Sequence, residues 1–126
     1  MTSQPWPPTV QTLTIHGWLP EQLANGQHGH WSTRQRKINQ AKERVWLYAR
    51  NECWRPVHGK ARLTIVLVFP NHRRRDADNL HSRVKGVVDG CKPYIKDDST
   101  EWLELVVRAE VRPGCKQVEL TLEPVA

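Results

Sequence analysis

The chain has 126 residues and a formal net charge of +6, from 19 Lys or Arg and 13 Asp or Glu. This length suits one domain with a buried core, and the longest apolar run, residues 65–70, is far too short to span a membrane. Cys53, Cys91 and Cys115 lack the paired spacing of a disulfide framework or a zinc site. The N-terminus also lacks the basic and apolar segments of a signal peptide. We therefore expect an intracellular, cytoplasmic protein with no membrane attachment.

The positive charge is concentrated in the first and middle parts of the chain. Residues 28–60 hold eight Lys or Arg against two acids, and residues 72–96 hold seven against three. The last segment, residues 97–126, is net acidic. This distribution suits a polyanionic partner such as a nucleic acid, although an excess of solvated surface charge explains it about equally well.

The first half of the chain predicts a strand, a loop and a long helix. Residues 1–9 are rich in Pro, and we expect a flexible N-terminal segment before a single domain at residues 10–126. Residues 10–19 alternate as a strand does, and residues 17–32 contain the turn formers of a surface loop. Residues 34–53 then have helical periodicity. The apolar face of this helix is predicted to contain Ile38, Ala41, Val45, Tyr48 and Ala49.

The second half predicts a strand, a helix and two more strands. Residues 61–70 form an apolar strand that ends at a Pro, and residues 78–91 have helical periodicity. Residues 102–112 and 117–122 alternate around a Pro-Gly turn, which predicts a hairpin. The order β-α-β-α-β-β predicts an α+β fold, a small mixed sheet with two helices packed on it. The residues expected to face the core are Leu80, Val84, Val87, Val88 and Cys91 of the helix, and Leu103, Leu105, Val107, Ala109 and Val111 of the third strand.

Two groups of acidic residues flank the second helix. Asp76 precedes it, Asp78 lies at its N-terminus, and Asp97 and Asp98 follow it. Carboxylates held close together repel one another, and a divalent cation is a common reason to keep them in place. Oxygen ligands favour Mg²⁺ or Mn²⁺. Because three arginines, residues 73–75, run into the first group, a phosphate is the expected additional ligand, and the pattern indicates a metal-dependent nuclease.

Each of these residues also has a simpler interpretation. Asp78 is well placed to cap a helix, and acidic pairs such as Asp97 and Asp98 are frequent in surface turns. Lys85 lies on the same side of the predicted helix as Asp78, where it could hold a phosphate oxygen or orient the nucleophilic water. It could equally be a solvated lysine or an ion-pair partner of Asp89.

Residues 73–80, residues 85–90 and the pair Asp97 and Asp98 together resemble the RusA family of Holliday junction resolvases. The pattern of that family is Asp-x-Asp-Asn-Leu, a Lys with an Asp four residues after it, and a later Asp-Asp that begins a strand. The resemblance extends over residues 10–122, but its specific part runs from Asp76 to Asp98. The looser N-terminal match rests on Pro20, Asn25, His30, Trp31, Arg34 and Lys37.

The resemblance implies a homodimeric, Mg²⁺-dependent endonuclease that makes paired nicks in four-way DNA junctions and needs no small-molecule cofactor. It assigns roles residue by residue. The metal ligands are Asp76, Asp78 and Asp98, the catalytic lysine is Lys85, and the supporting acids are Asp97 and Asp89.

One feature departs from the family. Its lysine falls four residues after the second Asp, where this chain has Ser82, and Lys85 lies three residues further on. Both spacings are close to whole helical turns. Lys85 therefore lies on the same side of the helix as the family's lysine, but about one turn further along. This departure leaves open a catalytically weak or inactive module that binds branched DNA. A structural protein with capping aspartates is the third alternative.

Basic residues outside the acidic groups are candidates for phosphate contacts, which give affinity and salt dependence but read no sequence. Each is equally well explained as solvated loop charge. The six tryptophans are mostly expected in the core or at a dimer interface, with one of them, not identifiable from the sequence, available to stack on DNA. The candidate DNA-binding residues are Arg73, Arg74, Arg75, His30, Arg34, Arg36 and Lys37.

Overall fold

A computed structural model of the chain describes residues 10–21, 31–71 and 80–125. The expected N-terminal segment, residues 1–9, lies outside the described residues. The elements follow the order expected from the sequence, with an additional short 3₁₀ helix, η2, before the third strand. They are β1 (Gln11–His16), α1 (Trp31–Asn51), β2 (Ala61–Phe69), α2 (Leu80–Arg83), α3 (Lys85–Cys91), η2 (Lys92–Tyr94), β3 (Leu103–Val111) and β4 (Gln117–Pro124).

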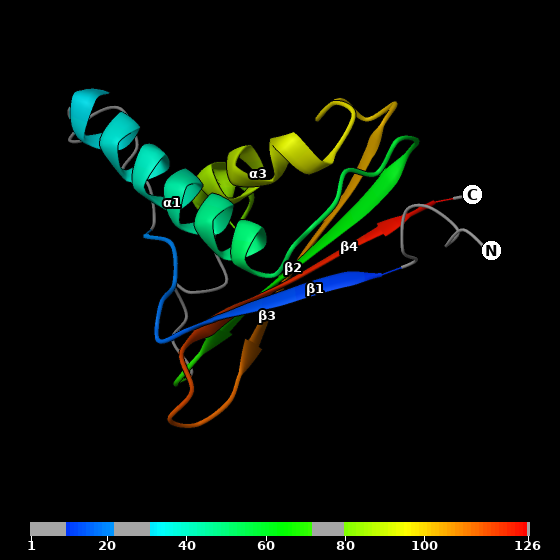
Figure 1. The fold of residues 1–126 in the computed structure, drawn as a ribbon. Coiled ribbons are helices and arrows are strands. Elements are labelled where there is room, and N and C mark those ends of the chain that lie inside the picture. The colour runs from blue at the N-terminus through cyan, green and yellow to red at the C-terminus, as the bar shows by residue number, and fades with distance from the viewer. Residues whose placement is uncertain (1–9, 22–30, 72–79, 126) are drawn as a thin grey trace.

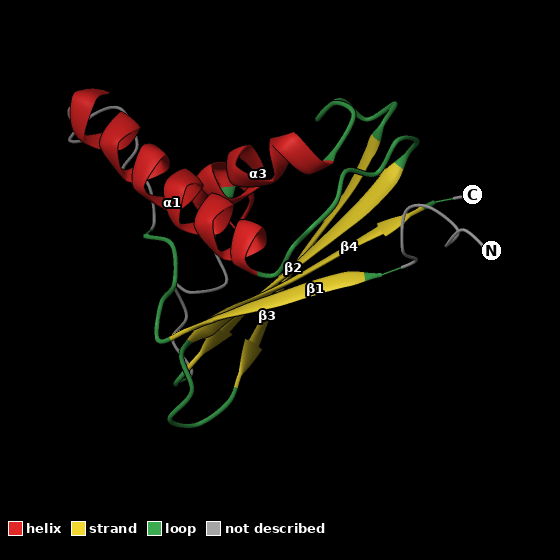
Figure 2. Ribbon diagram, in the orientation of Figure 1, coloured by secondary structure: helices red, strands yellow, loops and turns green. Residues whose placement is uncertain are grey.

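The strands form one mixed sheet in the order β1-β4-β2-β3. β2 and β3 are parallel, whereas β4 is antiparallel to both β1 and β2. α1 and α3 pack on the same face of this sheet (Figures 1 and 2). The predicted α+β class, a small mixed sheet with helices packed on it, is therefore confirmed. Within the part of the chain that the structure describes, no helix is long and apolar enough to cross a membrane.

The predicted hairpin between the last two strands is wrong, because β2 lies between β3 and β4. β2 is buried at every position from Ile65 to Phe69, so it takes the centre of the sheet and pairs on both sides. After β3 the chain runs past the last residue of β2. There the Arg112 backbone N–H donates to the Phe69 carbonyl at 3.0 Å. The turn that follows uses Gly114 at φ 73°.

α1 begins three residues earlier than expected and buries its predicted apolar face, with Tyr48 half-buried. It ends in a Schellman motif: the Trp54 N–H donates to the Ala49 carbonyl at 2.9 Å, and the Cys53 N–H donates to the Arg50 carbonyl at 3.0 Å. The residue in the left-handed conformation of this motif is Cys53, at φ 57°, where Gly is usual.

The predicted helix at residues 78–91 is divided into α2 and α3 at Val84, whose backbone has φ −96° and ψ 8°. α3 docks closely on α1, since a Cβ added at Gly86 would lie 2.5 Å from the Ile38 carbonyl oxygen. α3 is thus held in close contact with α1 directly after this break. The predicted core stripe is kept: Val84, Val87 and Cys91 are buried, and Leu80 and Val88 are half-buried.

The predicted inward face of β3 is confirmed only in its first half. Leu103 is buried and Leu105 and Val107 are half-buried against the core, but Ala109 and Val111 are exposed. β3 pairs only with β2 among the described strands, so the end of this edge strand has no neighbour on its outer side.

The sheet face away from the helices carries a network of ion pairs. Arg112 contacts Glu119 at 2.7 Å and Glu110 at 2.6 Å, while Arg62 contacts Glu104 at 2.6 Å. The hydrogen bond from Arg112 lowers the pKa of the Glu119 carboxyl below its usual value. This network ties the end of β3 to β4 across β2, although the two strands are not neighbours.

Candidate functional site

Three of the predicted site residues are linked along α3 and the segment that follows it. Lys85 and Asp89 lie one turn apart on this helix, with the Lys85 Nζ 3.8 Å from an Asp89 carboxylate oxygen. Lys92, at the start of η2, places its Nζ 3.4 Å from Asp89 and 3.4 Å from Asp98. We refer to Lys85, Asp89, Lys92 and Asp98 as the Lys92 cluster. It connects residues that are up to thirteen positions apart in the sequence.

The charges of the Lys92 cluster stabilise one another. The negative charge of Asp89, together with a hydrogen bond to Asp98, raises the pKa of the Lys92 ammonium group. The Asp89 side chain is only 17% exposed and lies between two lysines, whereas Asp98 is 44% exposed. Asp89 therefore acts as the inner carboxylate that orients both lysines, and Asp98 keeps an accessible oxygen.

Sequence reasoning missed Lys92. Its position three residues after Asp89 is the one signal that could have identified it, because side chains with that spacing are neighbours on a helix. Its contact with Asp98 depends on how the chain turns after η2, which no local pattern predicts.

Asp97 and Asp98, although adjacent, have different environments. Asp97 accepts a hydrogen bond from the Ser99 side chain, which is the main reason that its pKa is lowered. The loop is also held by Lys96, whose Nζ lies 3.8 Å from the centroid of the Trp102 ring. Asp97 thus stabilises its own loop while Asp98 contacts Lys92, and β3 begins only at Leu103.

The remaining predicted metal ligands, Asp76 and Asp78, lie outside the described residues. Among the residues that the structure does describe, no group of three or more His, Cys, Asp or Glu is arranged to hold a metal ion. Asp98 is the predicted ligand that can be located, and its exposed carboxylate offers the hard oxygen donors that Mg²⁺ prefers. That Asp98 binds the same metal ion as Asp76 and Asp78 stays a prediction.

Most of the predicted DNA-binding residues, Arg73, Arg74, Arg75 and His30, also lie outside the described residues. Of those on α1, Arg36 is exposed and Arg34 is half-buried.

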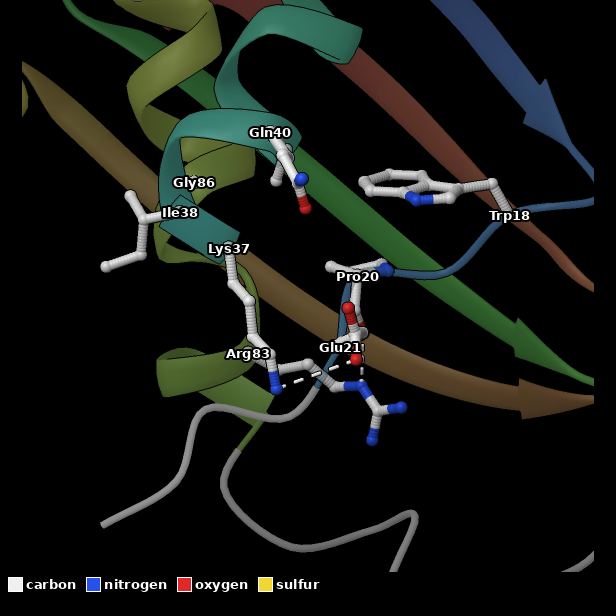
Figure 3. Close-up of a pocket in the computed structure, with 9 residues that line it drawn as sticks. Trp18, Pro20, Glu21, Lys37, Ile38, Gln40, Arg83 and Gly86 are labelled. Carbon is white, nitrogen blue, oxygen red and sulfur yellow. Dashed lines mark hydrogen bonds and ion pairs between the residues drawn. The ribbon is translucent and has the colours of Figure 1, made fainter. Parts of the chain in front are cut away.

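Lys37, also on α1, lies in a small pocket where its Nζ is 3.6 Å from Glu21 (Figure 3). In the same pocket the Arg83 Nε donates to the Pro20 carbonyl at 2.7 Å (Figure 3). The Arg83 guanidinium also lies over the Phe69 ring, 5.2 Å from its centroid. These contacts join α1, α2 and the segment after β1, so this pocket serves the packing of the elements.

Known proteins similar to this chain do not identify its activity. No family model matches the chain. The chain is similar to an uncharacterized protein of Xylella fastidiosa (strain Temecula1), with 28% identity over 118 residues that span 90% of this chain and 76% of that protein. This likeness assigns no activity, so a functional assignment depends on the residues themselves.

Proposed function

We propose that the protein is a Mg²⁺-dependent, structure-selective endodeoxyribonuclease of the RusA type, which resolves Holliday junctions by paired nicks in four-way DNA. The observation that carries the proposal is the Lys92 cluster. Lys85, Asp89 and Asp98, which the resemblance assigns to one site, are connected there by ion pairs. The Lys85–Asp89 ion pair is equally expected of an ordinary helix lysine, so the specific support is the connection of Asp89 to Asp98 through Lys92.

The proposed roles divide the residues into ligands and positioning groups. Asp76, Asp78 and Asp98 hold the ion, with Mn²⁺ as a possible substitute for Mg²⁺. When bound, the ion activates a water molecule and neutralises charge that develops on the phosphate. Lys85 holds a phosphate oxygen or orients the water.

The positioning groups are Asp89 and Lys92. Asp89 fixes the direction of Lys85 from the inner side of the cluster, and Lys92 holds the Asp98 carboxylate. Groups that orient metal ligands commonly matter almost as much as the ligands themselves.

A homodimer is part of the proposal, because two active sites related by a two-fold axis suit a substrate that needs symmetric cuts. Measurement of the molecular mass in solution tests this part by itself. A monomer at high protein concentration would contradict it.

The test of the proposed function compares a fluorescent four-way junction with a linear duplex of the same sequence, in Mg²⁺ and in EDTA. The native chain is expected to nick the junction selectively and only with Mg²⁺, and Asp78→Asn is expected to abolish nicking. Tight junction binding without nicking, independent of Mg²⁺, would instead identify a binding module, a function consistent with the shifted position of Lys85. Equal binding and equal nicking of junction and duplex, with no effect of Mg²⁺, would contradict both functions.

A further inference from the structure

A second pocket lies between α1 and the segment formed by α3 and η2, on the side of the Lys92 cluster. Its volume is about 410 Å³, which is within the size range of small-ligand sites. It differs from the pocket of Figure 3, which has a volume of only about 30 Å³. We call it the Trp46 pocket, and its lining includes Lys42, Trp46, Asp89, Gly90, Lys92 and Pro93.

Trp46 is the large apolar side chain in the lining of this pocket. It lies one residue after the buried Val45 and three before the buried Ala49, so it stands at the edge of the buried face of α1, and the residue is 40% exposed. By contrast, Trp54 is 7% exposed and its indole N–H donates to the Thr12 carbonyl at 3.2 Å. Trp46 therefore presents part of its indole to solvent beside the pocket.

Basic residues flank Trp46 on both sides along the helix. Lys42, Trp46 and Arg50 are spaced at i, i+4 and i+8, so they form one stripe on the surface of α1. The Arg50 guanidinium lies over the Trp46 ring, 5.5 Å from its centroid, so it already contacts one face of the indole. An aromatic face between two cations matches a nucleotide, which has a flat base and phosphates on either side of it.

On the α3 and η2 side the pocket is lined by Asp89, Gly90, Lys92 and Pro93. Gly90 packs so closely on α1 that an added Cβ would lie 2.7 Å from the Lys42 carbonyl oxygen. This contact fixes the distance between Trp46 and the wall that Gly90 and Pro93 provide. A rigid slot with one aromatic side suits a flat ring better than a flexible peptide.

The lining of the pocket contains two cations, Lys42 and Lys92, and two acids, Glu43 and Asp89, so its formal charges balance. Asp89 pairs with Lys85 and Lys92. Arg50, which contacts Trp46 from outside the lining, adds a positive charge on the α1 side, in keeping with the net charge of +6 of the whole chain.

We propose that the Trp46 pocket binds an unpaired base of a DNA strand, with the base stacked on Trp46 and the adjacent phosphates bound by Lys42 and Arg50. This inference rests on the proposed function and names the part of the substrate that this surface holds. Because Asp89 and Lys92 belong both to the pocket and to the Lys92 cluster, the bound strand passes directly beside the proposed catalytic residues.

The test uses the full chain in EDTA, where no cleavage occurs, and a single strand of roughly 12 nucleotides that carries one fluorescent 2-aminopurine base. Native protein is expected to bind the strand and to quench the fluorescence of the base by stacking. Trp46→Ala is expected to bind about tenfold more weakly and to lose the quenching, because stacking on an aromatic side chain contributes about 1–3 kcal/mol per base. Trp46→Phe is expected to restore most of both signals.

Two matched variants separate stacking from general effects. Leu47→Ala changes the adjacent residue, which is 52% exposed but lines a different groove, and is expected to bind like the native chain. Lys42→Met is expected to keep the quenching but to weaken binding and reduce its salt dependence. Unfolding temperatures of all variants establish that each one folds.

The outcomes distinguish this inference from the proposed function. Native-like binding and quenching by Trp46→Ala, or an equal loss in Leu47→Ala, would overturn the inference. If the native chain nicks junctions but does not bind the single strand, the inference fails while the proposed function stands. If the chain neither nicks nor binds DNA, both fail.

Discussion

At the residue scale, Lys92 is a cation that two carboxylates share. Its ammonium group lies 3.4 Å from both Asp89 and Asp98, and its side chain is 50% exposed, so its main contribution is to geometry and not to folding. In a nuclease of the proposed type, Lys92 keeps Asp98 directed at the metal position.

Replacing Lys92 by Met tests this role, because Met keeps the apolar part of the side chain and removes the charge. We expect nicking at saturating Mg²⁺ to fall by about 10- to 100-fold, as for other groups that orient metal ligands, with little change in unfolding temperature. Lys92→Arg should recover part of the rate. As a control, Lys116→Met removes an exposed lysine of the turn before β4 and should have no effect. Native-like nicking by Lys92→Met would refute the role.

A second residue-scale prediction concerns Cys53, which holds a left-handed conformation at φ 57° after the end of α1. A side chain in this conformation costs about 1–2 kcal/mol compared with Gly. Cys53→Gly should therefore raise the free energy of unfolding by about 1 kcal/mol in urea titrations. Cys53→Ala keeps the Cβ and should leave the free energy of unfolding unchanged. An increase in Cys53→Ala equal to that in Cys53→Gly would contradict the explanation.

At the element scale, the approach of α3 to α1 depends on two glycines spaced four residues apart. A Cβ at Gly90 would lie 2.7 Å from the Lys42 carbonyl oxygen and 2.8 Å from the Val45 Cβ, so neither helix can keep its position if a side chain is added. The same contact shapes the Trp46 pocket and sets the direction of the helix that carries Lys85.

Gly90→Ala is therefore expected to lower the free energy of unfolding by about 1–3 kcal/mol, the usual range for overpacking. Gly59→Ala is the matched control, because an added Cβ there meets no atom within 4 Å. Urea denaturation of the two variants and the native chain provides the measurement. Equal stability of Gly90→Ala and the native chain would show that the helices can separate without loss.

At the scale of the whole molecule, the ion pairs on the open sheet face link stability to pH. The pKa of Glu119 is lowered in the folded state, mainly by the hydrogen bond from Arg112. Its stabilising contribution is therefore fully present above the ordinary pKa of Glu and is lost as the pH falls through the lower, folded-state value. Acid should weaken the attachment of β4 to the end of β3.

Glu119→Gln should consequently reduce the dependence of the unfolding temperature on pH in the acid range below the ordinary pKa of Glu. Glu101→Gln alters an exposed acid in the loop before β3 and should keep the native pH dependence. An unchanged pH profile in Glu119→Gln would mean that the ion pair with Arg112 does not contribute to stability.

The sequence was sufficient for the parts of this molecule that depend on local patterns. Element order and the buried faces of α1 and α3 follow from apolar periodicity, as Val45 and Val87 illustrate. The place of β2 between β3 and β4 does not, because alternation indicates a strand but not its neighbour. Lys92 was missed for the same reason, since its contact with Asp98 forms only when the chain folds. Asp76 and Asp78 lie outside the described residues, so the metal site stays a prediction.

In the proposed function, Asp98 is a ligand in a metal-dependent active site. The most direct measurement is the single-turnover rate of junction nicking over a range of Mg²⁺ concentrations, for the native chain, Asp98→Asn and the control Glu101→Gln. We predict a loss of at least about 100-fold in Asp98→Asn, partly reversed at high Mg²⁺, and no change in the control. Mg²⁺-dependent nicking at the native rate by Asp98→Asn would contradict the account.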